Sequence, residues 1–251
     1  MSKFVSLLLL VLCATLTSAQ TTEKRKLSAF DKVYISGALD AELENGQDES
    51  VNIESANIPI DRIVTEIKGS SLYVYIDNKN ENYRNVRVKV WITCKNLVAI
   101  NKSGSGNLSG DASFKGDNFD LDLSGSGNIN LDGSIRGKEV KVNKSGSGNI
   151  KIGNIEAENI SVVVSGSGNT DVAKGSTKQQ TIRLSGSGNI NMPAVNSETC
   201  TVSISGSGDI EVQVSKSLDG KISGSGNITY HGNAQVINSA IAGSGRIHKK
   251  S

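Results

Sequence analysis

Residues 121–131 read LDLSGSGNINL, and the Gly-Ser-Gly at their centre recurs along the chain. Eight copies lie between Gly104 and Gly245. The steps between their central serines are 18 to 21 residues, and these serines are Ser105, Ser126, Ser147, Ser167, Ser187, Ser207, Ser225 and Ser244. A fixed period of this length is typical of repeat proteins in which every copy is one structural unit.

Apolar and polar residues alternate on both sides of each Gly-Ser-Gly. Before the second copy the apolar positions are Phe119, Leu121 and Leu123, and after it they are Ile129 and Leu131. Alternation with a period of two is the pattern of a half-buried strand. One strand–corner–strand unit cannot bury its apolar face alone, so the units should stack about 4.8 Å apart. We therefore predict an all-β fold, a parallel β-helix (β-solenoid) with coils of about 20 residues and Gly-Ser-Gly corners.

The corners carry two further signals. Glycine permits positive φ and lets successive corners stack without side-chain clashes. The next residue is asparagine in six copies, at Asn107, Asn128, Asn149, Asn169, Asn189 and Asn227, and it is Asp209 or Arg246 in the other two. Stacked asparagines could form a hydrogen-bonded ladder along the axis or a row that binds a ligand. We favour the structural ladder.

Residues 30–101 lack the full repeat but keep strand-like alternation. Val33–Gly37 reads as an eroded coil, and residues 63–67 and 72–76 flank Gly69 as a hairpin. No helix of ordinary length is predicted after the leader. We divide the chain into a signal peptide (1–19), a flexible N-terminus (20–29), a β region capping the solenoid (30–101) and the Gly-Ser-Gly β-helix (102–248).

The first residues predict export. Lys3 precedes an apolar run from Phe4 to Leu16, and small residues follow before a predicted cleavage ahead of Gln20. That run is too short for a membrane span, and no later stretch approaches that length. Without Lys3, 26 of the 27 basic residues remain against 25 acidic ones. A balance near zero gives no electrostatic case for nucleic acid or an anionic membrane surface.

Cys94 and Cys200 remain in the mature chain and lie five repeats apart. At strand spacing this is about 24 Å along the axis, beyond the reach of a disulfide. We predict that both thiols are unpaired and that Cys200 points inward.

No catalytic, cofactor-binding or metal site is predicted. Asp120 and Asp122, beside Lys141, are the best acidic cluster, but acids do not accumulate at the equivalent positions of adjacent coils. We interpret the cluster as a solvated face of mixed charge. The two histidines, His231 and His248, lie in the last coils and are expected at the surface.

The strand Val98–Ile100 running into Ser103-Gly104-Ser105-Gly106-Asn107, with the earlier Ile35-Ser36-Gly37, resembles the bacterial auto-transporter adhesin, head GIN domain family. The resemblance covers residues 30–247. It implies a right-handed β-helix without recognised catalytic residues, found in surface or envelope proteins of Gram-negative bacteria.

The leading hypothesis is an exported, non-catalytic, adhesin-like protein that presents a β-helix surface to a glycan or a protein. The expected location is the periplasm, the outer-membrane surface or the extracellular space. One alternative is a polysaccharide-degrading enzyme that uses the surroundings of Asp120 and Asp122. Another is a structural envelope component, and self-association of the chain stays open.

Overall fold

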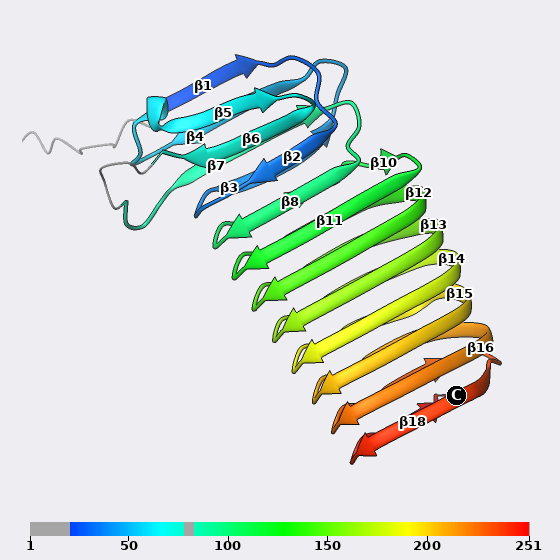
Figure 1. Cartoon of the computed structure of the whole chain (residues 1–251). Helices are drawn as coiled ribbons and strands as arrows, with labels where there is room; N and C mark the ends of the chain where they lie inside the picture. Colours follow the sequence, from blue (N-terminus) through cyan, green and yellow to red (C-terminus); the bar gives the residue numbers. More distant parts are fainter. Residues whose placement is uncertain (1–20, 78–82, 251) are drawn as a thin grey trace, which may run out of the picture.

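The computed structural model describes residues 21–77 and 83–250, so the predicted signal peptide lies outside the described part. These residues form one 3₁₀ turn, Ile60–Arg62, and strands that hydrogen-bond into a continuous sheet. Figure 1 shows the N-terminal strands at one end and a straight stack of coils running to the C-terminus.

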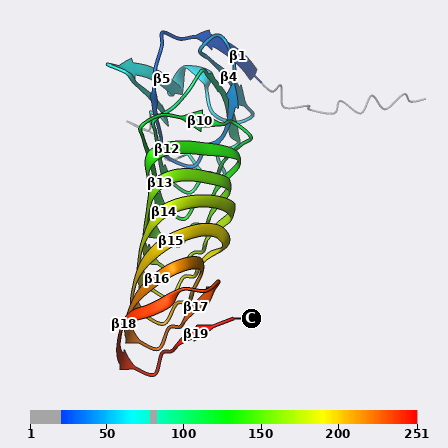
Figure 2. The same ribbon diagram turned by 90° about the vertical axis from the view of Figure 1, so that its right-hand side faces the viewer.

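The stack is the predicted parallel β-solenoid, and Figure 2 shows its coils edge on. Each of five long strands wraps from one corner to the next: β12 (Ile129–Gly146), β13 (Ile150–Gly166), β14 (Thr170–Gly186), β15 (Ile190–Gly206) and β16 (Ile210–Gly224). They pair in parallel with equivalent residues in register, as Val142 with Val162 and Val162 with Ile182. Coils on either side are completed by β8 (Ala99–Gly104), β9 (Leu108–Gly110), β10 (Phe114–Lys115), β11 (Asn118–Gly125), β17 (Ile228–His231), β18 (Gln235–Gly243) and β19 (Ile247–Lys249).

The two glycines of each corner serve different purposes. The first has positive φ, for example +111° at Gly146 and +120° at Gly166, which L side chains rarely adopt. The second has an ordinary φ but no space, because a Cβ on Gly168 would overlap the carbonyl oxygen of Gly148 in the preceding coil. Both roles that we predicted for the corner glycines are confirmed.

The predicted asparagine ladder is present along the corner. Asn128 donates from its backbone N and its Nδ2 to Oδ1 of Asn107, at 3.1 and 2.9 Å. The backbone part continues coil by coil to Arg246, whose N lies 3.2 Å from Oδ1 of Asn227. At the other end the ladder extends one coil further than predicted, since Oδ1 of Asp40 accepts from Asn107 N at 2.7 Å.

The N-terminal region continues the solenoid and then closes it. The strands β2 (Lys32–Ile35) and β3 (Asp40–Asn45) form the eroded coil, paired in parallel with β8 and β9. The predicted hairpin is β5 (Ile63–Lys68) and β6 (Ser71–Ile76). Antiparallel pairing adds β4 (Ser50–Ser55) to β7 (Val88–Cys94).

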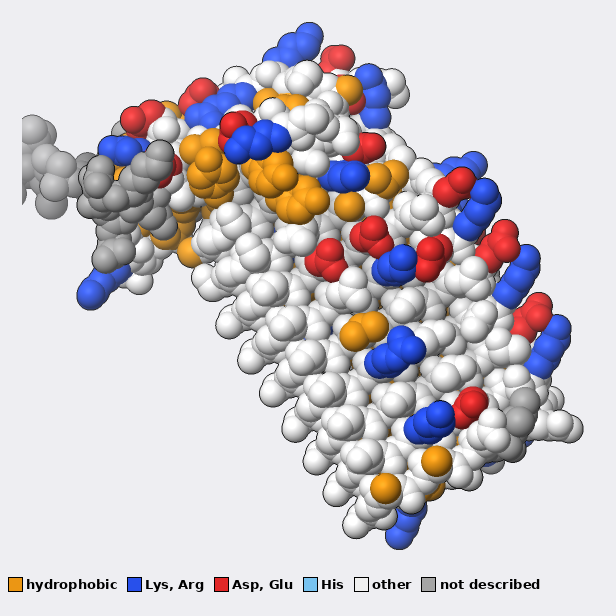
Figure 3. All heavy atoms as spheres, in the orientation of Figure 1, with side chains coloured by type: hydrophobic (Ala, Val, Ile, Leu, Met, Phe, Trp, Pro, Cys, Tyr) orange, Lys and Arg blue, Asp and Glu red, His pale blue; other side chains and the backbone are white. Residues whose placement is uncertain are grey.

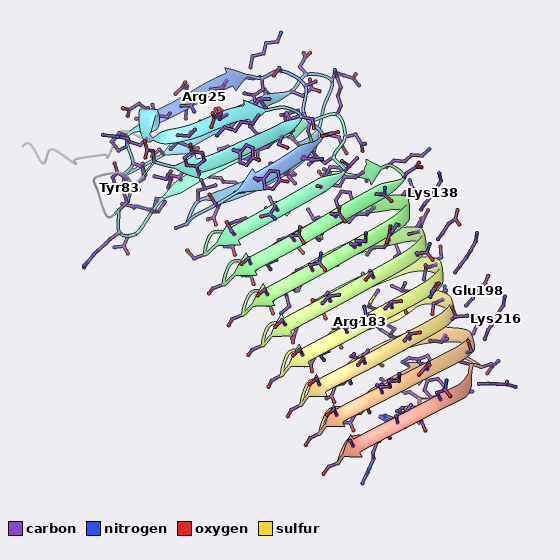
Figure 4. The ribbon with its side chains drawn as sticks, viewed as in Figure 1. Arg25, Tyr83, Lys138, Arg183, Glu198 and Lys216 are labelled. Carbon is purple, nitrogen blue, oxygen red and sulfur yellow. The ribbon has the colours of Figure 1, made fainter. Side chains whose placement is uncertain are left out.

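The prediction of a flexible segment at residues 20–29 is wrong for most of its length. Thr21–Lys26 forms β1, antiparallel to β4. Its side chains are mostly polar and exposed, so the strand is held by backbone pairing and by Arg25 rather than by an apolar face. Arg25 donates to the carbonyl oxygens of Ile63 at 2.5 Å and of Ile60 at 3.1 Å. This side chain, labelled in Figure 4, joins β1 to the start of β5.

The interior is one aliphatic column that runs through the coils. Inward positions such as Val142, Val162 and Val202 have no exposed surface. Phe114 and Phe119 stack in the first coils with ring centroids 5.4 Å apart. Packing of this kind leaves function to the outward side chains.

Candidate binding surfaces

Two outward faces of the coils are defined by their position relative to the corner. The long face consists of the strand segments that end at a corner, such as residues 119–124 and 140–145. The post-corner face consists of the short segments that follow a corner, such as residues 129–131 and 150–152. Both are parallel arrays in which one residue per coil occupies each row.

Asp120 and Asp122 both point outward on the long face from β11. Asp122 accepts a hydrogen bond from Nδ2 of Asn143 in the next coil at 2.8 Å. Lys141, which lies in register with Asp120, is 3.2 Å from Glu139 on its own strand. No second acid joins the pair from the neighbouring positions, which are Ala99 and Asn101 on one side and Lys141 and Asn143 on the other.

Tyrosines occupy the N-terminal continuation of the long face. Tyr34 of β2 and Tyr73 of β6 stack with ring centroids 4.8 Å apart and planes 11° apart. Lys68 Nζ lies 5.6 Å from the Tyr73 ring, and Tyr75 lies two residues along the same strand. Figure 3 shows hydrophobic side chains gathered over these strands, whereas the coils carry separate charged side chains on this face and a row of opposite charges along one edge. We call Tyr34, Tyr73 and Tyr75 the tyrosine surface.

The post-corner face carries a polar row that crosses four coils. The row consists of Asn130, Lys151, Asp171 and Asn191, which pair successively in register. Two depressions open on it, of about 550 and 340 Å³, and both are lined by Asn130, Lys151 and Asp171. The first also reaches the asparagine ladder, and the second reaches the small residues Gly153, Ala173 and Pro193. We call this surface the amide trough.

A column of alternating charge runs along another edge of the coils. Asp117 lies 3.1 Å from Lys138, Glu158 lies 3.0 Å from Lys178, and Glu198 lies 2.5 Å from Lys216. Figure 4 shows Lys138, Glu198 and Lys216 projecting from this edge. Because these pairs are exposed to solvent, each should contribute little to the stability of the fold. The sequence reading missed the column, although its members recur at the repeat period.

Lys102 and Lys144 occupy inward positions two residues before the first glycine of a corner. Lys102 is fully buried, and its Nζ donates to the carbonyl oxygens of Ser103 at 2.8 Å and Gly37 at 3.4 Å. Burial lowers the pKa of Lys102 to about 8, and the carboxylate of Asp40 partly opposes that shift. Lys144 donates to the carbonyl oxygen of Gly168, and burial lowers its pKa as well. Both ammonium groups are tied to corner carbonyls rather than presented to a ligand.

Cys94 and Cys200 are buried and unpaired, as predicted. Burial raises the pKa of each thiol to about 12. Such thiols are poor nucleophiles, because the thiolate is the reactive form.

The histidines lie on the last coils. His231 is half-buried and its Nε2 lies 2.8 Å from Oε1 of Glu211, which Lys250 also approaches at 2.9 Å. The hydrogen bonds from His231 and then Lys250 lower the pKa of Glu211. Across residues 21–77 and 83–250, no group of three or more His, Cys, Asp or Glu side chains could hold a metal ion.

The fold and these surfaces agree with a known family. The model of the family described as "Putative auto-transporter adhesin, head GIN domain" matches residues 29–153 and 120–234. The chain belongs to this family. None of the curated proteins matches this GIN-domain chain.

Solved structures of several bacterial proteins share this fold. One, described as a "putative lipid binding protein" from Parabacteroides distasonis ATCC 8503, is 28% identical with a TM-score of 0.84, over 94% of this chain and 98% of that one. Another, a "putative adhesin" from Parabacteroides merdae ATCC 43184, is 19% identical with a TM-score of 0.88, over the same shares. A "putative adhesin" from P. distasonis is 22% identical with a TM-score of 0.84, over 93% and 98%.

The family description and the descriptions of these structures name adhesion or lipid binding. They support a general role of the GIN-domain chain as an interaction protein. Membership of this adhesin family indicates a surface or exported protein. In the part of the chain that the structure describes, no helix has the length and apolar character that crossing a bilayer requires.

Proposed function

We propose that this GIN-domain protein is an exported, non-catalytic interaction protein of adhesin type. It presents the outer faces of its coils to a glycan or a protein at a cell surface. The predicted signal peptide supports export. Asp120 and Asp122 have no acid beside them in either neighbouring coil, and Asp122 is hydrogen-bonded to Asn143, so we favour a binding role over polysaccharide cleavage by a pair of carboxyl groups.

The observation that carries the proposal is the tyrosine surface. The phenylalanines of the described residues are buried in the core, whereas Tyr34, Tyr73 and Tyr75 stand outward and half-buried. Tyrosine offers a large apolar ring with a polar tip, and such side chains dominate contact surfaces. The stacking of Tyr34 on Tyr73 holds both rings in place before a ligand arrives, which reduces the entropy lost on binding.

A binding screen of residues 20–251 tests the proposal. Intact cells, glycan arrays and immobilised envelope proteins serve as ligands, and vesicles are added because one relative is described as lipid binding. We expect saturable binding to at least one glycan or protein surface. The double variant Tyr34→Ser/Tyr73→Ser should weaken it at least tenfold, about 1.4 kcal/mol.

Arg183→Ser is the matched control, because Arg183 is an exposed residue on the same face (Figure 4). It should leave binding unchanged. Equal melting temperatures would show that all three proteins are folded. Absence of binding to every surface, or equal loss in the control, would refute the proposal.

A further inference from the structure

The amide trough contains hydrogen-bonding groups that the fold leaves unused. Asn128 and Asn149 each use Nδ2 to donate to the asparagine of the preceding coil, at 2.9 Å. Asn169 donates only through its backbone N, to Oδ1 of Asn149 at 2.8 Å. Its Nδ2 has no hydrogen-bond partner among the described residues, and it lies in the lining of the larger depression.

Lys151 at the centre of the trough is also unengaged. Its ammonium makes no ion pair or hydrogen bond with the residues that the structure describes, although Asp171 occupies the next coil in register. Asp171 itself accepts from Nδ2 of Asn191 at 2.6 Å, which orients its carboxylate. The trough therefore offers free donors beside an oriented acceptor, spaced by one coil.

The opposite side of the row is small and apolar. Gly153, Ala173 and Pro193 line the second depression, and Ala173 and Pro193 are exposed. A ligand lying there would meet hydrogen-bonding groups along one edge and C–H surface along the other. The lining holds one cation, Lys151, and two carboxylates, Asp132 and Asp171, so its small net charge of −1 disfavours a polyanion and gives little attraction for a polycation.

We propose that the amide trough binds a short, uncharged saccharide chain that lies along the solenoid axis. Sugar rings have hydroxyl groups around their rim and C–H groups on their faces, which is the pattern that the trough complements. The row from Asn130 to Asn191 spans three coil steps, about 14 Å at strand spacing. This inference rests on the proposed function and adds a ligand class and a second site on a different face.

The test uses residues 20–251 and a panel of neutral oligosaccharides, with affinity measured by calorimetry and contacts mapped by amide chemical shifts. We expect shifts centred on residues 128–132, 149–153, 169–173 and 191–193. The double variant Lys151→Ala/Asp171→Ala should lose at least tenfold in affinity. Lys141→Ala/Asp120→Ala, the equivalent outward exchange on the long face, should bind like the parent.

The outcomes separate this inference from the proposed function. If both double variants retain oligosaccharide binding, the trough is not the binding site. The proposed adhesin-type function would then stand, with binding on another face. If no neutral oligosaccharide binds while cells or proteins are bound in the surface screen, the ligand class is wrong and the proposed function stands. Filling the trough with Ala173→Leu, which neither adds nor removes a hydrogen-bonding group, should also abolish binding. Unaltered affinity in that variant would contradict the site.

Discussion

Asn128 donates two hydrogen bonds to a single atom, Oδ1 of Asn107, one from its backbone N at 3.1 Å and one from Nδ2 at 2.9 Å. Asn149 repeats this arrangement on Asn128. The backbone N–H that follows each corner is thus paired with a side chain of the neighbouring coil. The ladder is therefore part of the fold, and most of its amides are occupied before any ligand binds.

Removing one rung should destabilise the chain. Asn149→Ala leaves the backbone N of Asn169 without its acceptor, so we expect a loss of about 1–2 kcal/mol in urea denaturation. Asn149→Asp keeps an oxygen acceptor, like Asp209, which accepts from the backbone N of Asn227. This variant should therefore lose less stability than Asn149→Ala. Asn143→Ala removes only an exposed side-chain bond to Asp122 and is the control. Equal losses in Asn149→Ala and Asn143→Ala would show that the ladder contributes nothing special.

The second glycine of a corner should tolerate no side chain. In Gly168→Ala the new Cβ meets the backbone of the preceding corner, which cannot move without breaking the stack. We expect a loss of at least about 3 kcal/mol or failure to fold. Ser167 lies in the same corner but is exposed, so Ser167→Ala should change the free energy of unfolding by no more than about 0.5 kcal/mol relative to the parent. Thermal unfolding followed by circular dichroism compares the two, and a stable Gly168→Ala protein would contradict the stacking account.

Thr170 is an inward residue whose hydroxyl has no described partner. It is fully buried and lies in register between Ile150 and Ile190. Thr170→Val keeps the shape and removes an unsatisfied polar atom, so it should raise the free energy of unfolding by about 1 kcal/mol. The outward Thr181→Val should change it little. A less stable Thr170→Val protein would mean that the hydroxyl is satisfied in the folded chain.

Lys102 should make stability depend on pH in the alkaline range. Its folded pKa of about 8 lies below the ordinary 10.5, so the unfolded chain binds more protons between these values. Stability contributed by this residue is therefore gained as pH rises from about 8 to 10.5. The free energy of unfolding of the parent and of Lys102→Met is measured by denaturation between pH 7 and 10. Over this range we expect the value of the parent to rise relative to that of the variant by about 1 kcal/mol or more. The raised thiol pKa values act in the opposite direction above pH 9, but both proteins share them. Parallel pH curves would contradict the buried-ammonium account.

The coils could be predicted from the sequence because their signals are local and repeated. Gly146 and Gly148 mark a corner, and Val140 and Val142 mark the strand before it. Asp40 was missed as the first ladder residue, because its corner reads Gly37-Ala38-Leu39 and lacks the Ser-Gly signal. The strand β1 was missed because its polar residues show no apolar face.

The surfaces were less predictable than the scaffold. The neighbours of Asp120 and Asp122 can be read from the sequence, because equivalent positions of adjacent coils lie in register. The amide trough depends on large and small side chains from adjacent coils lining the same depression, such as Lys151 and Ala173. The tyrosine surface depends on a parallel pairing of Tyr34 with Tyr73 across 39 positions. Neither relationship is encoded in a local pattern.

The most direct test of the central claim measures binding and bond cleavage on the same carbohydrates. Residues 20–251 are incubated with a polysaccharide panel, and bound protein is quantified together with new reducing ends and unsaturated products. A non-catalytic interaction protein predicts saturable binding of at least one carbohydrate with no product above a protein-free control. Product release that disappears in Asp122→Asn would contradict that account and would establish the polysaccharide-degrading alternative.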